Sequence, residues 1–140
     1  MSGGNPTATV IVPTLNHAET VAACLDGLAS QTLASDKMEV LVVDAGSSDA
    51  TVAAVVAWLA RHEGINARLL QEKLGSLALA RNAGAQAARA DVLLFLDADC
   101  VPAPDWVATM CSSLADPAII GVLVSASSRP TPVRSTSSST

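Results

Sequence analysis

The chain has 140 residues, 50% of them hydrophobic, and a formal net charge of −5 at neutral pH. This length fits one domain with its own core, and the acidic balance argues against a nucleic-acid partner, which needs a basic surface. No hydrophobic run approaches the ~20 residues of a spanning helix, and residues 1–6 have neither the basic flank nor the apolar stretch of a signal peptide, so we expect a cytoplasmic protein, or one peripheral to the inner face of the membrane.

Hydrophobic runs alternate with segments of helical pattern, which is typical of βαβ units in a parallel sheet. Strands are expected at residues 9–12, 38–43, 67–70, 92–96 and 119–124. The sequence therefore predicts an α/β fold, a Rossmann-like, mostly parallel sheet with helices on both faces.

Helices are expected between these strands. The first covers residues 17–30 with Asn16 as its N-cap, and the second covers 50–62 and is started by Ser48 or Asp49. The third covers residues 77–89, and Gly84 inside it costs about 1 kcal/mol relative to Ala, which predicts close packing against the sheet. The fourth follows Pro102 and Pro104 and ends near Asp116 and Pro117.

The two ends of the chain offer little to bury. Residues 125–140 form a Ser/Thr/Pro-rich segment that we expect to be a disordered tail, and residues 1–7 are expected to be a disordered N-terminus. The folded domain is expected at residues 8–124. Cys24, Cys100 and Cys111 form no paired motif and are expected to be reduced thiols.

Two carboxylates, Asp97 and Asp99, directly follow the strand expected at residues 92–96. Residues two apart in an extended backbone point to the same side and lie roughly 6.5 to 7 Å apart, so both side chains can approach one divalent cation. In open α/β sheets the ligand crevice lies at the carboxyl ends of the strands. The pair alone is weak evidence, because Asp is common where a strand runs into a turn.

Further polar or special residues follow the other expected strands and would line the same crevice: Pro13, Thr14 and Asn16, then Asp44 and Gly46, then Lys73. Asn16 equally fits a helix cap that needs no ligand, and Lys73 and Arg81 equally fit solvated surface charges. Asp44 at the end of a buried strand needs partners or water.

Four segments in chain order carry a family resemblance: VIVPTLN at 10–16, VVDAGSSD at 42–49, Gly75 with ARNAG at 80–84, and FLDAD at 95–99. Together they closely resemble the family 2 glycosyltransferases, inverting enzymes of GT-A fold. The resemblance covers roughly residues 8–124 and extends to Pro104 and Trp106 after the acidic pair.

The resemblance implies a role for each matched residue. Pro13, Thr14 and Asp44 would hold the base of a UDP- or GDP-sugar donor, beside Asn16, Gly46 and Lys73 in the same crevice. Arg81 would lie near the base or the diphosphate. Asp97 would approach the ribose, and Asp99 with Asp97 would hold the Mg²⁺ or Mn²⁺ that bridges the diphosphate.

The family pattern is incomplete in this chain. Ala45 stands where many members have a second acid, and after Asp116 the only charged residues are Arg129 and Arg134, which leaves no carboxylate there to act as general base. We therefore interpret the chain as a truncated, donor-binding half of a glycosyltransferase whose acceptor is unknown, with self-association expected through an exposed sheet edge. A non-catalytic remnant that binds a nucleoside diphosphate and metal, or an interaction module, is the alternative. A receiver-like or flavodoxin-like signalling domain would not explain residues 81–84.

Overall fold

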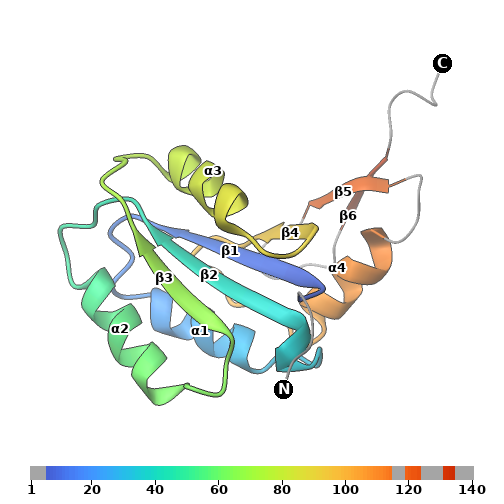
Figure 1. The fold of residues 1–140 in the computed structure, drawn as a ribbon, viewed down its shortest axis with the longest axis horizontal. Helices are drawn as coiled ribbons and strands as arrows, with labels where there is room; N and C mark the ends of the chain where they lie inside the picture. The colour runs from blue at the N-terminus through green and yellow to red at the C-terminus, as the bar shows by residue number, and fades with distance from the viewer. Residues whose placement is uncertain (1–5, 115–118, 124–130, 135–140) are drawn as a thin grey trace.

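The computed structural model describes residues 6–114, 119–123 and 131–134 (Figure 1). Its centre is a four-stranded parallel sheet in the order β3-β2-β1-β4. The strands are β1 (Ala8–Thr14), β2 (Met38–Asp44), β3 (Ala67–Gln71) and β4 (Val92–Phe95). All four lie where hydrophobic runs predict strands, and the parallel α/β fold is confirmed.

Helices cover both faces of the sheet (Figure 1). α1 (Val21–Ala29), α2 (Thr51–Arg61) and α4 (Trp106–Leu114) contribute to one hydrophobic core, which includes Val10 and Val12 of β1. α3 (Leu77–Ala87) covers the opposite face, where Ile11 packs with Leu41, Val43 and Ala80 in a smaller cluster. Alternate residues of β1 thus enter different cores, as the two-residue period of a strand requires. A short 3-10 turn, η1 (Ser35–Lys37), precedes β2.

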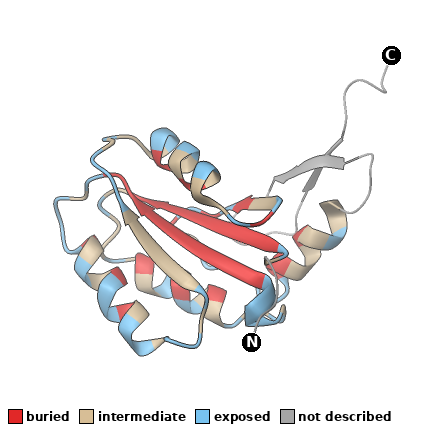
Figure 2. Ribbon diagram, in the orientation of Figure 1, coloured by how far each residue is buried: buried red, intermediate tan, exposed pale blue. Residues whose placement is uncertain are grey.

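The two central strands are buried along their whole length, whereas β3 at the edge is largely of intermediate exposure (Figure 2). A central parallel strand that is covered on both faces typically consists of a continuous run of hydrophobic residues. Glu39 in β2 is a charged exception that is also completely buried.

The predicted start of the first helix is wrong. α1 begins at Val21 with Thr20 at the N-cap, and Asn16 lies in a left-handed conformation with φ 61°. A left-handed residue does not have the extended backbone of a typical N-cap. Its side chain instead binds the loop after β2.

The other helix boundaries lie closer to the prediction. α2 begins at Thr51, whose N–H donates to Asp49 Oδ1 at 2.9 Å, so Asp49 does serve the start of this helix although Ala50 holds the N-cap position. α3 begins after Ser76, whose hydroxyl oxygen accepts from the N–H of Leu79. It ends at Ala87, two residues before the expected end, because the backbone that follows turns toward Glu39.

The fifth expected strand is present but belongs to a different sheet. β5 (Ile119–Leu123) pairs antiparallel with β6 (Thr131–Arg134) in a two-stranded sheet. β6 corrects the expectation of a disordered tail for its four residues. Residues 1–5, 125–130 and 135–140, and the expected end of the fourth helix near Asp116 and Pro117, lie outside the described residues.

None of the helices in the described part of the chain is both long and apolar enough to cross a membrane. β3 and β4 are the outer strands of the parallel sheet, and Phe95 at the end of β4 is 45% exposed. Outer strands and exposed apolar side chains favour association, and self-association stays a prediction that sedimentation would test.

Candidate functional site

The carboxyl ends of the four parallel strands point to one edge of the sheet. We call this edge the rim and define it by the segments that leave the strands there: 13–20, 44–50, 71–76 and 96–105. Ligands of open α/β sheets bind at such an edge. Every residue that the sequence predicts for the site lies in these segments, except Arg81, which is in the second turn of α3.

Asp44 is enclosed by hydrogen bonds from its own surroundings. Its Oδ1 accepts from the hydroxyls of Thr14 at 2.8 Å and Ser47 at 2.5 Å, and its Oδ2 accepts from the N–H groups of Gly46 at 3.1 Å and Ser47 at 2.9 Å. The residue is only 3% exposed. These donors occupy the lone pairs that a nucleotide base would use, so the geometry favours an indirect role for Asp44, in shaping the loop.

The hydrogen bonds also set the charge of this carboxyl. Burial raises the pKa of Asp44, but the hydrogen bonds from the side chain and backbone of Ser47, from Thr14 and from Gly46 outweigh burial and hold the pKa below its ordinary value. Asp44 is therefore a carboxylate at neutral pH, and it keeps its four donors in place.

Asn16 joins the loop after β1 to the loop after β2. Its side-chain oxygen accepts from the N–H groups of Ser48 at 2.8 Å and Asp49 at 3.3 Å, while its own N–H donates to Ser47 Oγ at 2.8 Å. The N–H of His17 donates to Thr51 Oγ1 at 2.8 Å in the same seam. The two loops therefore behave as one unit.

Gly46 and Lys73 are neighbours at the rim. Gly46 has φ 111°, a conformation that side chains other than hydrogen rarely permit, and a Cβ placed on it would lie 3.5 Å from Lys73 Cα. Backbone hydrogen bonds fix this neighbourhood, because the N–H groups of Leu74 and Gly75 both donate to the carbonyl of Ala45, at 3.0 and 2.8 Å. Lys73 is exposed.

Arg81 meets the acidic pair across the rim. Its Nη2 lies 3.1 Å from Asp97 Oδ1, with side-chain exposures of 39% and 60%. α3 supplies Arg81 and the segment after β4 supplies Asp97, so two elements that are 16 residues apart in sequence form this pair. An exposed ion pair of this kind contributes little to stability, and both partners are accessible to a ligand.

Asp97, Asp99 and Cys100 can each place one ligand atom within 4.8 Å of the others. Carboxylate oxygens are the ligands that Mg²⁺ and Mn²⁺ prefer, and Mg²⁺ typically takes one or two carboxylates together with substrate phosphates. The two exposed aspartates fit such an ion. The thiol of Cys100 is a soft group that does not suit it, and it points its hydrogen bond at Asp99 Oδ1, at 3.5 Å.

Two thiols beside the acidic pair remain protonated. Burial raises the pKa of Cys24 to about 12, with smaller contributions from Cys100, Asp99 and Asp97. Burial, followed by the hydrogen bond and the charge of Asp99, also raises the pKa of Cys100. The Sγ of Cys24, in α1, lies 3.7 Å from the carbonyl oxygen of Asp97. The contact between α1 and the acidic segment is therefore made by a neutral thiol.

The structure brings the predicted residues together as two groups. Hydrogen bonds and backbone contacts connect Thr14, Asn16, Asp44, Gly46 and Lys73, whereas Arg81, Asp97 and Asp99 form the second group. Pro13 is buried at the end of β1. Because β1 is bonded to both β2 and β4, the two groups share the rim.

Sequence reasoning missed Ser47, which binds Asp44 and Asn16 at once. It also missed Glu39, which is buried at the opposite edge of the sheet. Glu39 does leave a signal, because it is a lone acid inside a hydrophobic strand and a buried carboxylate must have partners.

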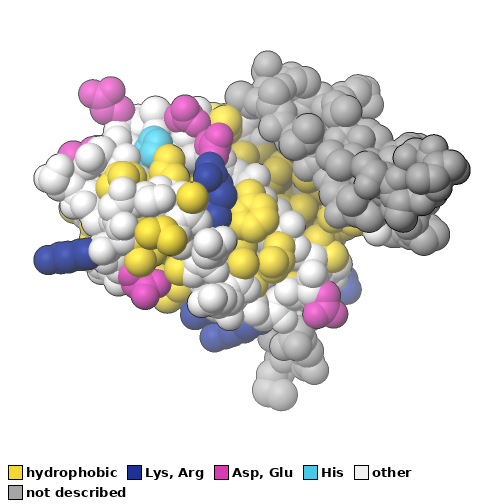
Figure 3. Space-filling model, turned by 90° about the horizontal axis from the view of Figure 1, so that it is seen from above, with side chains coloured by type: hydrophobic (Ala, Val, Ile, Leu, Met, Phe, Trp, Pro, Cys, Tyr) yellow, Lys and Arg dark blue, Asp and Glu magenta, His cyan; other side chains and the backbone are white. Residues whose placement is uncertain are grey.

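The face that α3 covers carries both charges and apolar side chains. Figure 3 shows acidic side chains next to a basic one along a border of this face, with hydrophobic side chains gathered beside them. Leu79 of α3 and Phe95 of β4 are 48% and 45% exposed. Charged side chains of both signs therefore lie beside an apolar surface, a combination that suits a ligand with charged and uncharged parts.

Known proteins with similar sequences are sugar-transfer enzymes. The chain is 37% identical to the glycosyltransferase AglE of Haloferax volcanii over 107 residues, 76% of this chain and 35% of that protein. It is 38% identical to the validoxylamine A glucosyltransferase of Streptomyces hygroscopicus subsp. jinggangensis over 114 residues, 81% of this chain and 26% of that protein. The chain thus spans about a third or less of the length of these relatives.

Solved structures agree with the sequence comparison. The mannosyltransferase PcManGT from Pyrobaculum calidifontis, solved with GDP-Man and Mn²⁺, superposes with a TM-score of 0.77 at 36% identity, over 84% of this chain and 35% of that one. S. aureus TarS, solved with UDP-GlcNAc, superposes with a TM-score of 0.70 at 26% identity, over 79% of this chain and 31% of that one. The α/β sheet described above is therefore that of GT-A glycosyltransferases.

The sequence model of one protein family matches almost the whole chain. The pattern described as Glycosyl transferase family 2 matches residues 9–139, which include all four parallel strands except the first residue of β1, and the rim. The chain belongs to glycosyltransferase family 2.

Proposed function

We propose that this chain binds the nucleoside diphosphate part of a UDP- or GDP-sugar donor, together with Mg²⁺ or Mn²⁺, for inverting transfer of the sugar. The observation that carries the proposal is the meeting of Arg81 with Asp97 at 3.1 Å, beside Asp99 in a group whose ligand atoms lie within 4.8 Å. Carboxylates for a cation and a guanidinium for phosphate are thus adjacent and exposed.

Asp99 and Asp97 would hold the cation, and Arg81 would donate to phosphate oxygens. A guanidinium suits this task because its N–H groups form parallel charge-assisted hydrogen bonds to a phosphate. A bound divalent ion stabilises the negative charge that develops on the departing diphosphate. The side chains of Arg81 and Asp97 remain partly exposed in their ion pair, so a ligand can reach both.

The joined loops after β1 and β2 would form the other end of the donor site. Thr14 and Asp44 hold the loop, Gly46 permits close approach of a flat base, and the exposed Lys73 stands beside Gly46. Pro13 and Asn16 fix the end of β1 and its link to the second loop. We assign the donor class from PcManGT, solved with GDP-Man and Mn²⁺, and from TarS, solved with UDP-GlcNAc.

An inverting transfer also requires a general base at the acceptor hydroxyl. Asp97 and Asp99 are assigned to the cation, and Asp44 is bound within its loop, so none of these three acids is assigned the role of base. Donor binding is the part of the reaction that the site residues described above would perform.

The test is calorimetric titration of the full chain with UDP and with GDP, each with and without Mn²⁺. We expect the titration to show binding that depends on Mn²⁺. In urea denaturation, a ligand concentration of 100 times Kd should raise the free energy of unfolding by about 2.7 kcal/mol. Asp99→Asn should weaken binding at least about tenfold, because a typical charge-assisted contact contributes about 1.5 to 3 kcal/mol.

Asp91→Asn is the matched control. Asp91 is an exposed aspartate that precedes β4 at the opposite end of the strand, so the substitution changes the net charge by the same amount. We expect it to bind as the wild type does. Equal losses in the two variants, or no binding of either nucleotide by the wild type, would contradict the proposed site.

A further inference from the structure

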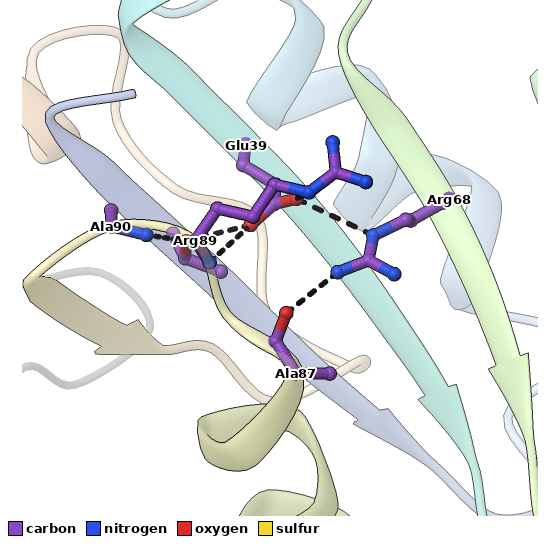
Figure 4. Close-up of polar contacts among 6 residues, drawn as sticks. Glu39, Arg68, Ala87, Arg89 and Ala90 are labelled. Atoms are coloured by element: carbon purple, nitrogen blue, oxygen red, sulfur yellow. Dashed lines mark hydrogen bonds and ion pairs between the residues drawn. The ribbon is translucent and has the colours of Figure 1, made fainter. Parts of the chain in front are cut away.

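Glu39 is a completely buried carboxylate at the amino end of the sheet, far along the strand from the rim. It lies in β2 on the face covered by α3, and its exposure is 0%. A buried charge is costly unless it is paired and hydrogen-bonded. Figure 4 shows that Arg68 and Arg89 both approach it.

The partners of Glu39 come from three other elements. Its Oε1 accepts from the hydroxyl of Thr9 in β1 at 2.8 Å and from the N–H of Arg89 at 3.1 Å. Its Oε2 lies 3.4 Å from Nε of Arg68 in β3 and 3.7 Å from Nε of Arg89. One carboxylate therefore connects three strands with the segment that follows α3.

These contacts hold the C-terminal end of α3. Arg68 Nη2 donates to the carbonyl oxygen of Ala87, the last residue of the helix, at 2.7 Å, and the N–H of Ala90 donates to Thr9 Oγ1 at 3.3 Å (Figure 4). The last carbonyls of a helix lack partners within the helix, and a cation there is favourable for the helix dipole. The end of α3 and the segment after it are thus fixed by Glu39 together with Arg68 and Thr9, two side chains that contact Glu39.

The middle of α3 touches the sheet directly. A Cβ on Gly84 would lie 2.6 Å from Ile11 Cγ2 and 3.2 Å from Val43 Cγ2, so the helix backbone rests on these side chains. A helix held at its end and its middle is a rigid rod with a rise of about 1.5 Å per residue, which places Arg81 about 9 Å along the axis from Ala87. Arg81 reaches Asp97 from this rod.

We propose that Glu39 is a positioning residue for the donor site: by fixing the C-terminal end of α3 it sets the place of Arg81 opposite Asp97, and thereby the affinity for a nucleoside diphosphate. This inference rests on the proposed function for the role of Arg81. Glu39 itself touches no ligand, because it lies at the other end of β2 from Asp44.

The test is a double-mutant cycle with Glu39→Gln and Arg81→Ala, read as the Kd for UDP or GDP with Mn²⁺ by titration calorimetry. Glutamine keeps the shape of the side chain and removes its charge. Glu39→Gln should weaken binding about 2- to 30-fold, the range of couplings carried through packed elements. In the Arg81→Ala background the same substitution should have no further effect, because its path of action is already removed.

Two further variants separate positioning from general loss of stability. Val55→Ala removes buried volume under α2, away from α3, and should leave the Kd unchanged. Thr9→Val is close in shape to the wild type but removes a donor to Glu39 and the acceptor of the Ala90 N–H. It should weaken binding in the same direction and to a smaller extent, and it serves if Glu39→Gln does not fold.

Amide hydrogen exchange without ligand gives a second readout. Glu39→Gln should speed exchange in residues 77–87 of α3 and leave residues 51–61 of α2 unchanged. Wild-type affinity in Glu39→Gln and Thr9→Val, or a loss that persists undiminished with Arg81→Ala, overturns the positioning role. Absence of nucleotide binding by the wild type overturns the proposed function, and exchange then decides whether Glu39 holds α3.

Discussion

The two ends of the parallel sheet both place acids beside arginines, but they differ in exposure and in pairing. At the amino end, Glu39 is fully buried and has two arginines and a threonine as partners. At the rim, Asp97 is 60% exposed in its side chain and shares a single arginine, while Asp99 is exposed beside it.

This difference separates a structural charge from a charge available to ligands. A buried carboxylate whose oxygens are all engaged stabilises the fold through its partners and has nothing left to offer a ligand. Exposed acids held close together repel one another, so a cation that joins them is favoured. The contrast predicts that substitutions at the amino end lower stability and affect binding only indirectly, through α3, whereas substitutions at the rim affect binding directly.

The largest effect on stability is expected from Glu39→Leu. Loss of the carboxylate leaves the Thr9 hydroxyl and the Arg89 N–H without their acceptor in a buried site, which should lower the free energy of unfolding by about 3 kcal/mol. Asp97→Asn at the rim should change it by less than about 1 kcal/mol, because its ion pair is exposed. Urea denaturation measures both, and equal losses would erase the proposed distinction between the two ends.

Gly84→Ala tests the contact between α3 and the sheet, through which the two ends communicate. Displacement of Ile11 should cost about 1 to 3 kcal/mol, and the better helix propensity of Ala should return about 1 kcal/mol, so we expect a net loss of about 0 to 2 kcal/mol in unfolding experiments. Gly64→Ala is the control, since a Cβ there meets nothing within 4 Å. A stabilised Gly84→Ala protein would show that the helix can move away from the sheet at little cost.

Asp44 sharpens the comparison, because it lies at the rim but is enclosed like Glu39. Hydrogen bonds from Ser47, Thr14 and Gly46 outweigh the effect of burial and lower its pKa, so its stabilising contribution is complete above the ordinary pKa of an aspartate, about 3.9, and is lost as pH falls through the lowered value. Asp44→Asn should cost about 1 kcal/mol at neutral pH and less in acid. A loss that is independent of pH would contradict this linkage.

The smallest effect on stability near neutral pH is expected at Cys24, whose reactivity reports on the contact between α1 and the acidic segment. Because burial raises its pKa to about 12, the thiol stays protonated at pH 8 and should resist alkylation by iodoacetamide in the native chain. Above the ordinary thiol pKa the unfolded chain loses this proton first, so stability should fall as pH rises toward the raised value. Mass spectrometry after labelling identifies the modified thiol, with the half-buried Cys111 as the internal control; rapid native labelling of Cys24 would mean that α1 opens readily.

Much of the fold could be predicted from local pattern. The four parallel strands follow from hydrophobic runs whose length and spacing suit buried strands, and the close packing predicted from Gly84 is present. The start of α1 could not be predicted in this way. Asn16 has the chemistry of a helix cap, but Ser48 and Asp49, more than 30 residues away, offer it N–H groups in a different loop.

The candidate site shows the same division. Asp97 and Asp99 stand out because two acids end a hydrophobic run, and Arg81 stands out through the family pattern. The enclosure of Asp44 by Thr14 and Ser47 does not appear in the sequence, because it depends on where β1 ends relative to β2. The donor roles of these residues remain predictions for the binding experiments above.

Sequence alone determined the alternation of strands and helices and the placement of polar residues after each strand, because the backbone periods of 2 and 3.6 residues are local properties. Only the tertiary structure decided which carboxylate is free and which is engaged. Asp44, Asp97 and Glu39 have the same ionisable group, and the strand order β3-β2-β1-β4 determines which donors each one meets. Hydrogen bonds and burial are properties of neighbours in space, and those neighbours come from segments up to 81 residues apart in this network.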